Sequence, residues 1–181
     1  MVTRLTAEEM NERWRALRSR LLTGLHPEAG DPIQSDVPIA VYESSSVHDP
    51  ALFARLERAR AATGAGALYA LGYDLGADGE VLPNDGFRVD GADADAWLAA
   101  GNEHGWAING LSFAIADDSA SWVVMSVVDA QVVACLPALL GPLFGDRAAA
   151  EAAVQAFAAE FDTPAMMPAF RAMAGYARVR G

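Results

Sequence analysis

Residues 122–144 read WVVMSVVDAQVVACLPALLGPLF, and this nearly unbroken apolar stretch decides the fold. Its length would suffice for a membrane span, which needs about 20 residues. However, Asp129 stands near its centre and would cost about 2.5–3.5 kcal/mol in a bilayer. Pro137 and Pro142 would interrupt a helix, and a high valine content favours strands in water. We therefore predict two buried strands, joined by a turn at Asp129-Ala130 and followed by a short helix.

The first of these strands is predicted to lie in the interior of the sheet. Its side chains alternate, with Trp122, Val124, Ser126 and Val128 on one face and Val123, Met125 and Val127 on the other. Both sets are largely apolar, so neither face is suited to water. We expect helices to cover this strand on both sides.

Helical and strand patterns flank this core. A capping box at Thr6–Glu9 predicts a helix over 7–22, and a cap at Asp49 predicts a second helix that ends before Gly64. Further strands are expected at 37–43, 67–73, 111–116, 122–128 and 131–136. Two turn signals, Ala77-Asp78-Gly79 and Asn84-Asp85-Gly86, indicate short edge strands near 80–82 and 87–89. Further helices are expected at 94–100, 137–145, from Asp146 onward, and after Thr163-Pro164. No linker divides the chain, so we predict a single α+β domain over 1–181, with a central, mainly antiparallel sheet, flanking helices and a helical C-terminus.

The charge of the chain limits its partners. The net charge is −11 over 181 residues, which argues against nucleic acid and anionic membranes and favours a basic protein partner. The charge is uneven, since residues 1–20 carry +2, residues 171–181 carry +3 and the section between carries −16. We expect the basic ends to fold back onto the acidic body or to dock a neighbouring subunit of a homo-oligomer.

The sequence carries no strong catalytic signature. Its single cysteine, Cys135, excludes an intramolecular disulfide, and apolar neighbours predict a buried, unreactive thiol. The three histidines are scattered and lack zinc-ligand spacing, so we assign no catalytic residue, metal or cofactor. The N-terminal residues MVTRLTAEEMNERW lack the apolar segment of a signal peptide, which favours a cytoplasmic location.

The acidic section from Asp74 to Asp95 supports the leading functional hypothesis. Its carboxylates are Asp74, Asp78, Glu80, Asp85, Asp90, Asp93 and Asp95, and they stand against one basic residue, Arg88. With Phe87 and Trp97 as aromatic anchors, this section would dock a basic protein without catalysis. Bacterial immunity proteins and other inhibitors of basic toxins have this combination of size and charge.

Residues 74–85 also partly resemble a calcium-binding loop. The resemblance is incomplete, because Gly76 offers no side-chain ligand at the third position and strand-like sequence precedes the loop. We expect a polar hairpin connection here, and whether it binds a cation stays open.

An enzyme or ligand-binding domain is the alternative hypothesis. Glu103 and His104 lie close in sequence to Trp106 and Asn109, and a carboxylate, an imidazole and an amide together can serve acid–base chemistry. The pocket would lie between the sheet and the terminal helices, with Trp122 in its lining. An enclosed pocket that contains His104 and a second titratable group would favour this alternative.

Overall fold

The computed structural model describes residues 1–44, 49–91, 94–104, 112–127, 130–161 and 168–181. The strands are β1 (Val2–Arg4), β2 (Ile39–Glu43), β3 (Ala67–Leu75), β4 (Val81–Asp90), β5 (Phe113–Asp117), β6 (Trp122–Val127) and β7 (Ala130–Cys135). The helices are α1 (Ala7–Arg20), α2 (Pro50–Thr63), α3 (Ala94–His104), α4 (Leu140–Phe144), α5 (Arg147–Phe161) and α6 (Pro168–Tyr176), and a 3-10 turn, η1, spans Pro137–Leu139. Within these residues the strands form one antiparallel seven-stranded sheet in the order β1-β4-β3-β5-β6-β7-β2. The predicted α+β layout with a helical C-terminus is therefore confirmed.

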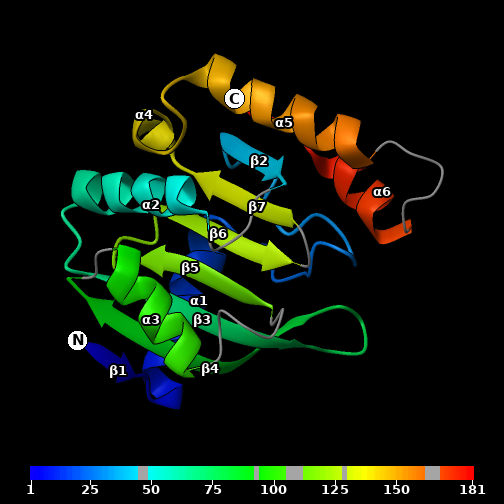
Figure 1. Cartoon of the computed structure of the whole chain (residues 1–181). Coiled ribbons are helices and arrows are strands. Elements are labelled where there is room, and N and C mark those ends of the chain that lie inside the picture. The colour runs from blue at the N-terminus through cyan, green and yellow to red at the C-terminus, as the bar shows by residue number, and fades with distance from the viewer. Residues whose placement is uncertain (45–48, 92–93, 105–111, 128–129, 162–167) are drawn as a thin grey trace.

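The strand β6 lies inside the sheet and is buried on both faces, as predicted. Val123 and Met125 belong to the core on the α1 side, whereas Trp122 and Val124 belong to the core on the α2 side. Figure 1 shows α2 and α3 in front of the sheet and α1 behind it. The turn predicted at Asp129-Ala130 falls partly outside the described residues. No helix in the described ranges is long and apolar enough to cross a membrane.

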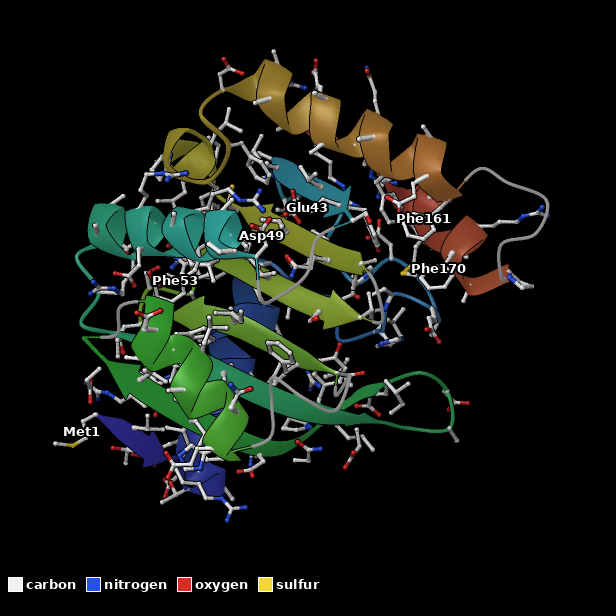
Figure 2. All side chains as sticks on the ribbon, viewed as in Figure 1. Met1, Glu43, Asp49, Phe53, Phe161 and Phe170 are labelled. Atoms are coloured by element: carbon white, nitrogen blue, oxygen red, sulfur yellow. The ribbon has the colours of Figure 1, made fainter. Side chains whose placement is uncertain are left out.

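The C-terminal helices close one edge of the sheet. Helix α5 packs along the edge strand β2, and α6 folds back against α5. The rings of Phe161 and Phe170 stack between these two helices at a centroid distance of 4.9 Å (Figure 2). The start predicted for the last helix, Thr163-Pro164, lies outside the described residues, and α6 itself begins at Pro168.

Local sequence signals fix the start of α1 and both ends of α2. The backbone N–H of Glu9 donates to Thr6 Oγ1 at 3.2 Å, and Thr6 N–H donates to Glu9 Oε2 at 2.8 Å, which completes the predicted capping box. Asp49 accepts a hydrogen bond from the N–H of Ala51 at 2.8 Å, and Gly64 ends α2 in the left-handed region with a φ of 70°.

Several predicted boundaries differ from the structure, and two of these differences affect the candidate site. Helix α3 continues past Gly101 to His104, because an interior glycine costs only about 1 kcal/mol relative to alanine and the buried Trp97 and Ala100 hold the helix on the core. The signal Asn84-Asp85-Gly86 is no turn; it lies inside β4, one continuous strand from Val81 to Asp90. The edge position belongs to β1, a three-residue strand too short to show a sequence pattern.

Both basic ends of the chain fold back onto the acidic body, which confirms the first of the two predicted arrangements. Arg178 and Arg180 both donate to the carboxylate of Asp31. At the other end, the guanidinium of Arg4 binds Asp85 through two hydrogen bonds of 3.0 Å. Docking to a neighbouring subunit stays a prediction.

Cys135 lies in the core, as predicted. Burial raises the pKa of its thiol to about 12, which keeps the sulfur protonated at neutral pH.

A buried carboxylate links α2 to the sheet. Asp117, at the end of β5, is 2% exposed. It accepts hydrogen bonds from Thr63 Oγ1 at 2.5 Å and from Trp122 Nε1 at 2.8 Å. Ser119 donates to it through both its N–H, at 2.8 Å, and its hydroxyl, at 2.5 Å. Since a buried charge is stable only when its lone pairs are satisfied, these donors belong to the fold and not to a reactive site.

We expect Asp117→Ala to lower the free energy of unfolding by about 3 kcal/mol, because each buried donor left without an acceptor costs about 1–3 kcal/mol. Urea denaturation measures this change. Thr63→Val removes one donor only and should cost about 1 kcal/mol. In the Asp117→Ala background, Thr63→Val should cost almost nothing, and additive effects of the two substitutions would contradict the network.

Candidate ligand-binding site

A cavity of about 220 Å³ lies between the sheet and the last residue of α3. Ala70 and Gly72 of β3 and Phe113 of β5 form its apolar floor. Its walls are formed by Asn84, Asp85 and Phe87 of β4, by His104 of α3 and by Ser112. An apolar floor with a few converging polar groups is the usual composition of a small-molecule site.

The aromatic wall of the cavity depends on the extra turn of α3. The ring of His104 stacks on Phe87 with a centroid distance of 4.7 Å and an interplanar angle of 24°. Had α3 ended before Gly101, the His104 imidazole would not stand over the sheet at this point. The turn that the sequence did not predict is therefore the one that completes the cavity.

A β-bulge supplies the polar wall. Leu71 pairs with Gly86 and Tyr73 pairs with Pro83, so Gly72 alone faces both Asn84 and Asp85. The flanking residues Leu71 and Tyr73 lie in the core on the α1 side. Because side chains alternate along a strand, Gly72 and the two residues opposite it face α3.

A side chain at position 72 of this bulge would crowd Asn84 and Asp85. A Cβ atom there would lie 2.7 Å from Asn84 Oδ1 and 3.2 Å from the carbonyl oxygen of Asp85. Because Gly72 has no side chain, the Asn84 carboxamide can lie against β3 at this position. The position of the Asn84 side chain in the cavity therefore depends on Gly72.

The carboxylate of Asp85 is held in a fixed position. Arg4 Nε and Nη2 bind its two oxygens at 3.0 Å each, and the N–H of Gly86 donates to Oδ1 at 2.8 Å. The edge strand β1 thus contributes to the site through Arg4.

A row of polar residues continues from the cavity across the sheet. Starting at Phe113, the cross-strand partners at this level are Ser126, Gln131 and Glu43. Gln131 is fully buried and Glu43 is 7% exposed. Arg55 of α2 binds the carboxylate of Glu43 with both of its terminal nitrogens, one of them at 2.9 Å. Figure 2 shows Glu43 at the end of β2, so this end of the sheet is polar where its middle is apolar.

The structure brings together only part of the predicted alternative pocket. His104 lines the cavity, and Asp85 provides the second titratable group, whereas Glu103 is exposed on α3. Trp106 and Asn109 lie outside the described residues. Trp122, expected in the lining, is fully buried and bound to Asp117. The cavity lies beneath α3 and not under the terminal helices, which corrects its predicted location.

The sequence did not identify Gly72, Asn84 or Ser112 as site residues. The pattern Asn84-Asp85-Gly86 is typical of a turn, and a turn would place this amide in a connection between strands. The residue pairs that create the bulge join β3 to β4, and no local pattern specifies such a register.

The residues predicted to dock a basic partner separate into three groups. Asp74, Asp78, Glu80 and Asp95 are exposed; Asp85 and Asp90 form ion pairs with Arg4 and Arg88; Phe87 and Trp97 are buried. The proposed role of these two aromatics as surface anchors is therefore wrong. Trp97 packs against Phe53 of α2 at a centroid distance of 6.3 Å, and Phe87 lies under His104. Asp93 lies outside the described residues.

The exposed carboxylates Asp74, Asp78 and Glu80 lie at the closed end of the hairpin between β3 and β4, hereafter the acidic hairpin (residues 74–82). The predicted hairpin connection is thus confirmed. Among the residues that the structure describes, no three His, Cys, Asp or Glu side chains come together in a way that could hold a metal ion.

A neighbouring loop braces the acidic hairpin. The N–H of His26 donates to the carbonyl of Gly79 at 2.8 Å, and the N–H of Val81 donates to that of Gly24 at 2.9 Å. His26 is 3% exposed, and its ring lies 6.0 Å from that of Tyr73. Burial lowers the pKa of His26 from its usual 6.5, although the nearby Glu28 acts in the opposite direction.

The chain matches no protein-family model, and it has no significant match among curated proteins or solved structures. Its function has to be argued from the geometry of the molecule.

We expect the buried imidazole of His26 to make the folded protein less stable in acid. Since the folded state holds this imidazole neutral, the unfolded chain binds more protons once the pH falls below about 6.5, and stability falls with it. His26→Gln removes the titrating group. Its melting temperature should therefore drop less than that of the wild type between about pH 7.5 and about pH 5.5, as measured by circular dichroism. Equal drops in the two proteins would contradict this assignment.

Proposed function

We propose that this protein binds a small molecule in the cavity between α3 and the sheet. The observation that carries the proposal is the convergence of Asn84, Asp85, Ser112 and His104 around an apolar floor. The cavity contains His104 and a second titratable group, Asp85, which supports a ligand-binding domain, although the exposed side chains of His104 and Asn84 leave it open to solvent and not enclosed. The proposal concerns binding, and no reaction is assigned.

The dimensions of the cavity limit the ligand. Pockets for drug-sized molecules measure about 300–1,000 Å³, whereas this cavity measures about 220 Å³. A molecule of one or two rings therefore suits it. The ligand would contact Phe113 below and the stacked pair of Phe87 and His104 at the side.

We expect small aromatic molecules to bind here with dissociation constants of about 1 mM or below, which two-dimensional NMR detects as shifts of the His104 and Phe113 ring signals. Ala70→Leu fills the floor and should weaken binding at least about tenfold, because the added side chain occupies the cavity. Ala99→Leu adds the same atoms at an exposed position of α3 and serves as the control. Melting temperatures establish that both variants are folded. Undiminished shifts in Ala70→Leu would contradict the proposal.

As a second function, we propose that the acidic hairpin docks a basic protein. Asp74, Asp78 and Glu80 are exposed, and none of them forms an ion pair with another described residue. Leu75 and Leu82, exposed by 48% and 42%, add apolar surface beside these charges. Figure 1 shows the hairpin projecting from the body of the molecule.

Charged residues around a few apolar contacts are typical of a protein interface. The hydrogen bonds from the His26 loop already hold the hairpin in place, so binding would cost little conformational entropy. An immunity-type or inhibitor role in the cytoplasm remains part of this second proposal.

Neutralising the acidic hairpin should abolish this interaction. We expect the variant Asp74→Asn, Asp78→Asn, Glu80→Gln to lose basic proteins that the wild type captures from a lysate at low salt. The variant Glu8→Gln, Glu12→Gln, Glu160→Gln changes the net charge equally at exposed helical positions and should retain them. Quantitative mass spectrometry compares the captured proteins. Loss of the same proteins from both variants would indicate a nonspecific charge effect and contradict docking.

A further inference from the structure

Building on the proposed ligand site, we infer that Asn84 selects the ligand. The site would take a flat, uncharged ring that carries a hydrogen-bond donor and an acceptor side by side. Aromatic carboxamides and purine bases share this edge. Asn84 would then be the specificity-determining residue, and Gly72 the residue that makes room for it.

The position of the Asn84 amide carries the inference. The bulge turns Asn84 toward α3, and the absent side chain of Gly72 lets its carboxamide lie across β3 at the cavity wall. A carboxamide offers an acceptor oxygen and an NH₂ donor at a fixed spacing. It therefore pairs best with a ligand edge of the complementary pattern, as asparagine does with adenine.

The other polar group of the bulge has little capacity left for a ligand. Both oxygens of Asp85 are bound by Arg4, and one also accepts from the N–H of Gly86. The exposed side chain of Asn84 forms no hydrogen bond with another described residue, so its amide is available to a ligand.

The aromatic side chains of the lining favour a ring as the ligand. Phe87 and His104 are stacked nearly parallel, at 24°, and Phe113 lies in the floor. Aromatic rings favour offset-stacked or edge-to-face contact with another ring, which adds about 0.5–1.5 kcal/mol to the area they bury. A flat ring bound in the cavity would contact residues of this lining, to which Asn84 also belongs.

Four probes test the inference by NMR titration: benzamide and adenine carry the donor–acceptor edge, toluene lacks it, and benzoate replaces it with a charge. We expect the wild type to bind benzamide or adenine at least about tenfold more tightly than toluene or benzoate. Asn84→Leu, similar in size but unable to form hydrogen bonds, should remove the preference over toluene and leave toluene binding unchanged.

Gly72→Ala should also remove the preference, because its Cβ displaces the Asn84 amide. Gly66→Ala is the matched control, since a Cβ at Gly66 would meet nothing within 4 Å. Melting temperatures of all three variants separate a loss of ligand from a loss of fold.

The outcomes separate this inference from the proposed function. If no ring binds the wild type, both fail. If rings bind without a preference, or if Asn84→Leu keeps the wild-type preference, the cavity binds ligands but Asn84 does not select them, and only the inference is overturned. Tighter binding of either edge-bearing probe supports it, and the stronger of the two identifies the class as carboxamide or purine.

Discussion

The strand β6 carries apolar side chains on both faces, so it is stable in water only where both faces are covered. This constraint determines the arrangement of the whole chain. Helix α1 covers one face, α2 and α3 cover the other, and α5 lies along the β2 edge. An antiparallel sheet with one solvated face would need fewer helices, whereas here each side has a core of its own.

The cavity exists because one end of this double-sided sheet departs from regular pairing. At the bulge, a single glycine in β3 lies opposite two residues of β4, and both of their side chains face α3. The same glycine leaves an opening beside the adjacent strand, and the last turn of α3 covers it with an aromatic stack. Bulges are enriched beside functional sites because they redirect side chains without disturbing the remaining ladder.

Signals confined to a few neighbouring residues predicted the fold well. The capping box at Thr6 and the glycine at position 64 fixed helix ends, and the alternation around Val124 correctly indicated a strand covered on both sides. The site was predicted less well. His104 was identified, but its partner Asn84 depends on the register between β3 and β4, and a register is a property of two segments together. Helix α3 exceeded its predicted end because core packing outweighed the cost of Gly101.

The order of the strands has a consequence for synthesis. The two edge strands, β1 and β2, come first in the chain, but their partners are β4 and β7, and the last of these ends at Cys135. A nascent chain therefore leaves the ribosome with two strands that have nothing to pair with, whereas the strands from β3 to β7 join mainly to sequence neighbours as they emerge. Until β4 and β7 have been synthesised, α1 is the N-terminal element whose end groups are hydrogen-bonded within its own segment.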